Sequence, residues 1–228
     1  HIQVLANAGA IVSNHDYHLG AFLREHFVNG TAFANEAIAH IPDDLPMAEV
    51  EAFSIDDSTT TEIDDALSVQ PLDNGNTRVG IHIAAPALGV LPNTPLDAEV
   101  MKRLSTVYMP GHKITMMPEA AIRPFSLDAG EIKPVLSLYI EITAEFNVVK
   151  RDTKLERIKI AQNLRHDSLE PYFNEATLEA DSGHPLWSQL LLLFRFAESL
   201  EKARGKYDPT KPQPVDYNFY VNQGIVSI

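Results

Sequence analysis

The 228-residue sequence contains no cysteine. Disulfide bonds, thiolate nucleophiles and cysteine-ligated zinc are therefore excluded for this chain. It also has no long apolar run, since the LLLLF at 190–194 is too short to cross a bilayer, and no secretory signal pattern. Phosphate-binding P-loop, GxSxG and GxGxxG motifs are absent as well. We expect a cytoplasmic protein with no membrane partner.

Basic residues are scarce, with 18 Lys and Arg against 31 Asp and Glu, a formal net charge of −13 and a pI near 5.0. This balance argues against a protein that coats nucleic acids, which would be basic. The charge is uneven, because residues 51–73 hold seven acidic groups and no basic ones, whereas residues 102–165 hold eleven Lys and Arg against seven acids. An acidic pocket beside a basic wall suits a polyanionic substrate, and an ordinary mixed surface is the alternative.

The acid-rich segment FSIDDSTTTEIDDALS, residues 53–68, contains five carboxylates and no cation, namely Asp56, Asp57, Glu62, Asp64 and Asp65. Carboxylates this dense repel one another unless a hard cation such as magnesium neutralises them. On an extended strand Glu62 and Asp64 would share a face, and Asp65 would point away unless the strand ends there. Asp56 joins them only if the chain folds back through the hydroxyl run 58–61. An acidic solvated loop is the alternative.

This segment resembles the signature of the RNB family, the catalytic domain of ribonuclease II and ribonuclease R. The family pattern I-D-x-x-x-x-x-D-x-D-D-A-L reads here as Ile55-Asp56, followed by EIDDAL at 62–67. Two further blocks in the same order also resemble the family, VGIHIAAPALGV at 79–90 and the block at 105–142, and the likeness runs from about 49 to 228. Two positions depart from the family, because Asp is usual where Glu62 stands and many members have Asp at Ala85.

The resemblance implies a metal-dependent hydrolytic 3′-to-5′ exoribonuclease that degrades single-stranded RNA to nucleoside 5′-monophosphates. It implies Mg²⁺ as cofactor, with Mn²⁺ as a substitute, and a catalytic metal cage formed by Asp56, Glu62, Asp64 and Asp65. Tyr108 occupies the position of a base-stacking aromatic ring. His112, Lys113 and Arg123 are further candidate RNA contacts. The alternative is a catalytically inactive RNA- or protein-binding module that retains the RNB fold.

Two features of the family are missing from these 228 residues. RNB enzymes use an arginine in a Ser-Pro-Ile-Arg-like motif far downstream of the acidic cluster, and they carry a C-terminal S1 barrel. We therefore expect this chain to be the N-terminal half of an RNB domain that is inactive by itself. The C-terminal half and the S1-like domain would be partners, on the same parent chain or on a second chain.

Residue periodicity predicts an α+β fold with a mixed or antiparallel β-sheet core and packed helices over 47–228. Residues 1–46 are expected to form a small helical module, with a winged helix as one candidate. This module would contain helices at 17–30 and 31–41. Residues 41–52 are expected to form a linker. Within the core we expect strands around a turn at 73–76, a helix over 94–107 capped by Thr94, and a helical turn at 118–122. A hairpin of long strands is predicted over 133–162, and a closing hairpin around 222–224. The strongest helix is expected at 184–206, with an apolar stripe formed by Leu186, Leu190, Phe194, Ala197 and Leu200.

Overall fold

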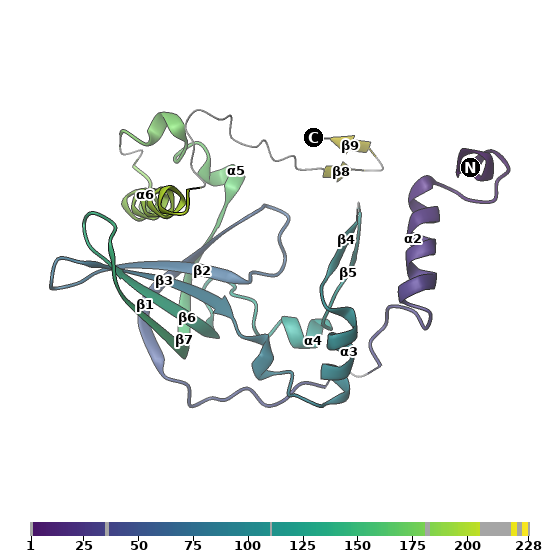
Figure 1. Cartoon of the computed structure of the whole chain (residues 1–228), viewed down its shortest axis with the longest axis horizontal. Helices are drawn as coiled ribbons and strands as arrows, with labels where there is room; N and C mark the ends of the chain where they lie inside the picture. Colours follow the sequence, from purple (N-terminus) through teal and green to yellow (C-terminus); the bar gives the residue numbers. More distant parts are fainter. Residues whose placement is uncertain are drawn as a thin grey trace.

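The computed structural model describes residues 2–34, 37–109, 111–180, 183–205, 220–222 and 225–227. Its core is a closed barrel of five strands in the order β1–β2–β3–β6–β7 (Figure 1). The strands are β1 (Met47–Asp56), β2 (Asp65–Pro71), β3 (Thr77–Ala84), β6 (Ile132–Ile142) and β7 (Val148–Arg165). Four neighbouring pairs are antiparallel, and the parallel pairing of β1 with β7 closes the barrel. With the helices around it, this architecture confirms the predicted α+β fold.

The strands alternate between a buried inner face and an outer face, as their sequences require. The inner cluster contains Ala52, Ile63, Ala66, Leu127, Val135, Ile158 and Ile160, all at most 1% exposed. The turn between β2 and β3 lies where it was predicted, and Gly75 adopts the positive φ of 83° that favours glycine there. The predicted hairpin of long strands is also confirmed, because β6 and β7 pair over most of their length.

Helix α6 (Trp187–Ala203) covers part of the outer face of the barrel, above it in Figure 1. Its Phe196 packs with Val79 of β3 and Ile142 of β6. The helix was predicted correctly, but its stripe was wrong at two positions, because Phe194 and Ala197 are exposed. The face that contacts the core steps by three and four residues and therefore runs through Leu190, Leu193, Phe196 and Leu200.

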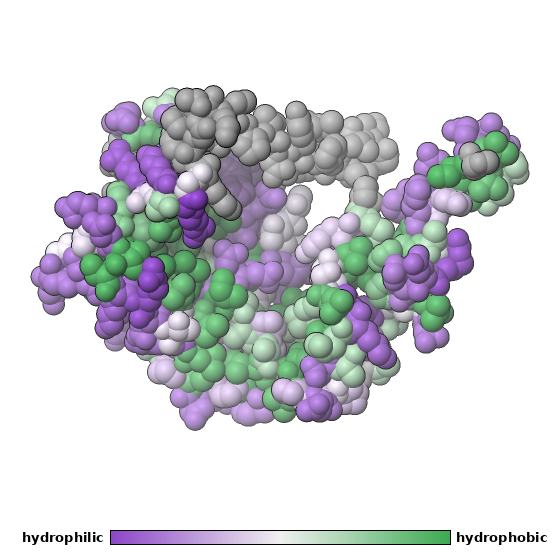
Figure 2. Space-filling view, viewed as in Figure 1, coloured by the Kyte–Doolittle hydropathy of each residue, from purple (hydrophilic) through white to green (hydrophobic). Residues whose placement is uncertain are grey.

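Beyond α6, part of the same outer face has no cover among the described residues. Ile83, Leu136 and Leu155 are cross-strand neighbours on β3, β6 and β7, and 40–48% of each is exposed. Green apolar surface is visible in the lower part of Figure 2, below α6. The side chains of Ile83, Leu136 and Leu155 are together called the outer apolar patch below.

The chain between β3 and β6 forms a separate layer beside the barrel (Figure 1). It contains the short 3-10 helix η1 (Pro86–Leu88), helix α3 (Pro95–Arg103), the hairpin β4 (Val107–Met109) and β5 (His112–Ile114), and the turn α4 (Glu119–Ile122). The predicted cap of α3 is confirmed, because the Thr94 hydroxyl accepts a hydrogen bond from the Asp97 N–H at 3.2 Å. The predicted helical turn at 118–122 corresponds to α4.

After β7 the chain forms α5 (His166–Leu169), the 3-10 helix η2 (Glu175–Thr177) and α6. The strands β8 (Tyr220–Asn222) and β9 (Ile225–Ser227) pair antiparallel, which confirms the closing hairpin, while its turn at 223–224 lies outside the described residues. No helix in the described ranges is long and apolar enough to cross a membrane.

The N-terminal part contains α1 (Ile2–Asn7) and α2 (Asn14–His26), the latter capped by Ser13. The helix predicted over 31–41 is wrong, because residues 31–34 and 37–41 are irregular. The linker prediction is wrong from Met47 onward, where β1 begins. A strand forms there because the Arg157 N–H on β7 bonds to the Pro46 carbonyl and so starts a parallel ladder. The division into a module at 1–46 and a domain at 47–228 remains a prediction.

Candidate functional site

The acidic segment connects the end of one barrel strand to the start of its neighbour. Asp56 is the last residue of β1 and Asp65 the first of β2, and the pairing of Phe53 with Leu67 brings these two ends together. The chain does fold back through the hydroxyl run, because the Thr60 N–H donates to the Asp57 carbonyl at 3.0 Å. Because the intervening residues are irregular, Glu62 and Asp64 precede the strand instead of lying on it.

Ile63, between two of the acids, anchors the segment in the core. Its side chain is 1% exposed. Its N–H donates to the Ser126 hydroxyl at 3.1 Å, and its carbonyl accepts from the Leu127 N–H at 2.9 Å. The Asp64 carbonyl in turn accepts from the Ala84 N–H at 2.8 Å. Because this backbone is held by three hydrogen bonds, the Cα positions of the flanking residues Glu62 and Asp64 are fixed.

Three of the four predicted site acids, Asp56, Asp64 and Asp65, form no ion pair with any described residue. Partial burial, followed by the charges of Asp65, Glu62 and Asp56, raises the pKa of Asp64. Partial burial and the charge of Asp56 raise the pKa of Asp65. These carboxylates therefore lie within electrostatic reach of one another and repel, as the sequence indicated.

The fourth acid, Glu62, is paired with a cation. Lys113 Nζ lies 2.6 Å from Glu62 Oε1 and 2.8 Å from Oε2, and the Thr61 hydroxyl donates to Oε2 at 2.7 Å. The Lys113 hydrogen bond is the main reason that the pKa of Glu62 is lowered. Lys113, predicted from the sequence as an RNA contact, thus ties β5 to the acidic segment.

Two cavities adjoin the acidic segment. The first, of about 160 Å³, is lined by Glu62, Asp64, Tyr108 and Lys113, among others. The Tyr108 side chain belongs to β4, and the residue is 76% exposed. The second, of about 350 Å³, is lined by Glu62, Lys113 and Arg123, among others. Both cavities therefore combine carboxylates with cations.

Other predicted site residues lie outside these two cavities. Asp56 and Asp65 stand at the strand ends without lining either one, and His112 is exposed on β5. Among the described residues, no three His, Asp or Glu side chains are already arranged to hold a metal ion. The predicted ligands are neighbours with the right donor chemistry, but they do not form a closed cage. One of them, Glu62, is already paired with Lys113.

Sequence reasoning missed the residues of β7 that support this site. Asn163 Nδ2 donates to the Ser54 hydroxyl at 2.9 Å, and that hydroxyl donates to Asp56 Oδ2 at 2.5 Å. Arg165 Nη1 donates to the Asp57 carbonyl at 2.8 Å. Ser54 was within reach of sequence reasoning, because it lies two residues before Asp56 on the same strand. Asn163 and Arg165 are more than 100 residues away in the sequence, and no sequence pattern indicated that they contact the acidic segment.

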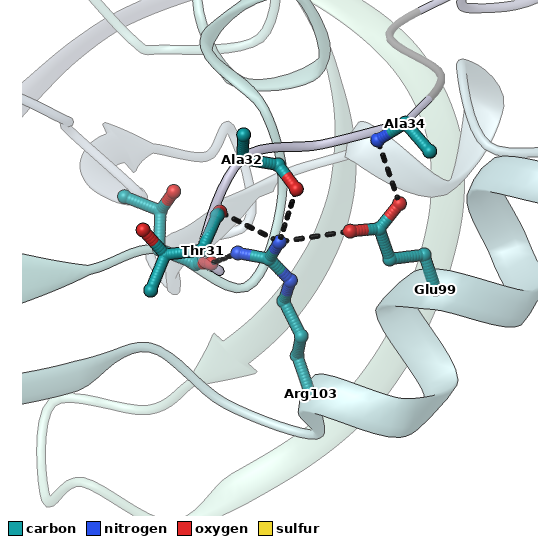
Figure 3. Close-up of polar contacts among 6 residues, drawn as sticks. Thr31, Ala32, Ala34, Glu99 and Arg103 are labelled. Carbon is teal, nitrogen blue, oxygen red and sulfur yellow. Dashed lines mark hydrogen bonds and ion pairs between the residues drawn. The ribbon is translucent and has the colours of Figure 1, made fainter. Parts of the chain in front are cut away.

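A further missed residue is Arg103 at the end of α3, whose side chain is 6% exposed. Its Nη1 donates to the Thr115 carbonyl at 2.9 Å, just past the β4–β5 hairpin. Its Nη2 donates to the carbonyls of Thr31 at 2.8 Å and Ala32 at 3.4 Å and pairs with Glu99 at 2.8 Å (Figure 3). One guanidinium thus joins α3, the hairpin and the segment that follows α2.

The acidic segment joins two barrel strands and borders cavities that also contain Lys113 and Arg123, so carboxylates and cations lie close together there. Residues 45–227 match the RNB domain, and the chain belongs to this family. The resemblance carried by the residues at 55–67 is therefore confirmed.

Two Arabidopsis thaliana proteins are each 32% identical to the chain over 159 residues, covering 65% of this chain and 15% of each relative. One is called DIS3-like exonuclease 2 and the other inactive exonuclease DIS3L2. The fold is similar to that of Mycoplasma genitalium RNase R in complex with ribose-methylated single-stranded RNA, with a TM-score of 0.65 at 16% identity. That match covers 80% of this chain and 29% of RNase R. The chain therefore spans less than a third of each of these proteins.

Proposed function

We propose that the chain is part of a metal-dependent exoribonuclease that hydrolyses single-stranded RNA from its 3′ end and releases nucleoside 5′-monophosphates. One observation supports this most. Asp56, Asp64 and Asp65 lie together at the ends of two barrel strands without a cation partner among the described residues, in a chain of the RNB family. A cytoplasmic location remains our expectation.

The donor set suits Mg²⁺, or Mn²⁺ in its place, because it consists of carboxylate oxygens. Asp56, Asp64 and Asp65 would hold the ion, and Glu62 would join them on leaving Lys113. When bound, such an ion activates water and neutralises charge that develops on the phosphate. Asp64 is the one of these three that also lines the smaller cavity, so its carboxylate would face the scissile end of the RNA.

The surroundings of the cavity support RNA as the partner. The exposed ring of Tyr108 is free to stack on a base, which binds RNA without regard to sequence. Lys113 and Arg123 line the larger cavity and would contact phosphates. His112, on the same hairpin as Tyr108, would contact the RNA outside both cavities.

Because the chain covers 15–29% of the compared proteins, we infer that further segments complete the active protein. By the resemblance these would be the C-terminal half of the RNB domain, with its arginine, and an S1-like domain. They would lie on the same parent chain or on a second chain.

The test uses the full-length protein. We expect Mg²⁺ to bind with measurable heat in calorimetry and Asp65→Asn to abolish that heat. We expect Asp64→Asn to abolish cleavage of a labelled single-stranded RNA while binding of the RNA survives, because the change acts on the reaction and not on the long RNA track. Asp73→Asn, in the β2–β3 turn, is the matched control and should behave as the parent. An Asp64→Asn variant that digests RNA at the parent rate would place the reaction elsewhere.

A second candidate is an inactive module that binds RNA or protein and keeps the RNB fold. The ion pair between Glu62 and Lys113 favours it, because it engages one of the four predicted ligands. The equal identity to a relative named as inactive is compatible with it. RNA binding by the full-length parent without metal-binding heat and without cleavage would identify this second function.

A further inference from the structure

We propose that Ser54 and Asn163 are positioning residues that orient the Asp56 carboxylate through one directed chain of hydrogen bonds. The proposal rests on the proposed function, in which Asp56 holds a metal ion. It goes further by assigning roles to two residues that are not among the four predicted ligands, one of them on a different strand, β7.

The two hydrogen bonds share one hydroxyl, which is shielded from water. Ser54 is 1% exposed and faces Asn163 across the parallel pairing of β1 and β7. The Asn163 amide donates to the Ser54 hydroxyl at 2.9 Å, and the hydroxyl donates to Asp56 Oδ2 at 2.5 Å. A hydrogen bond to an ionised carboxylate is shorter and stronger than one between neutral groups.

The donor and acceptor roles in these two hydrogen bonds follow from the number of protons available. The Asn163 amide nitrogen can only donate, so the Ser54 oxygen accepts from it and the single hydroxyl proton points to Asp56. The orientation of the amide is itself determined, because its oxygen accepts from the Ala129 N–H at 2.7 Å and its nitrogen also donates to the Leu127 carbonyl at 2.9 Å. A flipped amide would lose these contacts.

Residues 126–129 therefore support the acidic segment at two places. Ser126 and Leu127 fix the backbone of Ile63, between Glu62 and Asp64. Leu127 and Ala129 fix Asn163, and through Ser54 they fix Asp56. Residues 126–129 thus set the position of the first carboxylate relative to the others. Asp56 Oδ1 accepts no hydrogen bond from the described residues and is left for a ligand.

The experiment measures Mn²⁺ and Mg²⁺ affinity by calorimetry in the full-length protein, together with kcat and KM on single-stranded RNA. Removing a residue that orients a ligand typically weakens metal binding by about 10- to 100-fold. We expect Ser54→Ala and Asn163→Ala to lose affinity by about this factor, with KM for RNA unchanged and kcat recovering at high metal concentration. Ser54→Thr keeps the hydroxyl and should restore most of the affinity.

The matched control is Ser68→Ala, which removes an equally buried serine hydroxyl that bonds to His82 and not to a carboxylate. It should leave metal affinity unchanged. Asp56→Asn tests the proposed function separately and should abolish binding at this site. If Asp56→Asn loses the metal while Ser54→Ala and Asn163→Ala keep parent affinity, the positioning roles are wrong and the proposed function stands.

If Asp56→Asn also binds with parent affinity, the metal site itself has been misplaced and the positioning proposal falls with it. Thermal melting of every variant separates loss of folding from loss of affinity. Should Ser54→Ala fail to fold, the comparison of Asn163→Ala with the Ser68→Ala control decides the question, because Asn163 lies near the end of β7 and is half-buried.

Discussion

His82, on β3, has no exposed surface, and its two ring nitrogens lie within hydrogen-bonding distance of serine hydroxyls. Nε2 is 2.9 Å from Ser68 Oγ and Nδ1 is 2.8 Å from Ser137 Oγ. Gly80 is required beside this group, because a side chain there would collide with Ser68 and His82. Burial lowers the pKa of His82 from 6.5 to about 4, since the interior disfavours the charged ring.

This shift predicts a loss of stability in acid. Above pH 6.5 the ring is neutral in both the folded and unfolded states. Between pH 6.5 and about 4 the unfolded chain binds a proton that the folded chain does not, so the free energy of unfolding falls as the pH falls. At about 1.4 kcal/mol per pH unit, the loss reaches about 3 kcal/mol. Urea denaturation of the parent and of His82→Gln from pH 7 to pH 4 would measure it.

We expect the His82→Gln variant to be less stable at pH 7 but to lose less stability on acidification. The control is His15→Gln, because His15 is exposed on α2. Equal pH dependence in parent and His82→Gln would show that this histidine does not cause the acid sensitivity.

The Glu62–Lys113 ion pair affects the position of β5 more than the stability of the fold. About a third of each side chain is exposed. Ion pairs in such positions typically contribute about 0–1 kcal/mol, so the pair adds little to the stability of the fold. Its effect is local, because it fixes β5 beside the acidic segment.

At the scale of elements, the β4–β5 hairpin depends on side-chain contacts, because it pairs with no barrel strand in the described structure. The Met116 N–H donates to the Thr106 hydroxyl at 3.2 Å and closes its base. Arg103 bonds to the Thr115 carbonyl, and Lys113 pairs with Glu62. These contacts hold the Tyr108 ring near the cavity.

We predict that Arg103→Lys destabilises the protein by about 2–3 kcal/mol, since hydrogen bonds to a charged group each contribute about 1.5–3 kcal/mol and one ammonium cannot reach all the acceptors. Hydrogen exchange should increase in residues 31–34 and 107–115 together. Urea denaturation and exchange measured by mass spectrometry test both effects. Arg151→Lys, an exposed change on β7, is the control. Parent-like stability of Arg103→Lys, or faster exchange in one segment without the other, would contradict the coupling.

At the scale of the whole molecule, the outer apolar patch bears on how the chain works. Ile83, Leu136 and Leu155 continue the face that α6 covers, yet nothing among the described residues covers them. Exposed apolar side chains that gather on one face are commonly buried by another segment or partner. The proteins compared above are more than three times as long as the matched region, so they contain additional segments.

We therefore predict that the 228-residue chain alone does not trim RNA, whereas the full-length protein does. The expected reason is that the downstream arginine of the family and the covering segments are absent, and a single charge at the reacting phosphate often changes the rate by orders of magnitude. The assay uses a labelled oligoribonucleotide with Mg²⁺, and the full-length protein is the positive control. A monomeric, cooperatively folded fragment that shortens the RNA from its 3′ end would refute the prediction.

The sequence by itself determined the features that depend on near neighbours. Thr94 before Pro95 specified the start of α3, Gly75 marked the β2–β3 turn, and the residues at 55–67 identified the acidic segment and the family. These signals are local because caps, turns and strand alternation involve residues within a few positions of one another.

Only the tertiary structure decided which distant residues meet. The parallel pairing of β1 with β7 brings Asn163 to Ser54, 109 positions earlier, and the fold of the layer beside the barrel brings Lys113 to Glu62. It also turned Phe196 of α6 to the core in place of Phe194. Such contacts depend on which faces are buried together when the barrel closes, and side-chain periodicity along one strand or helix contains no information about its partner.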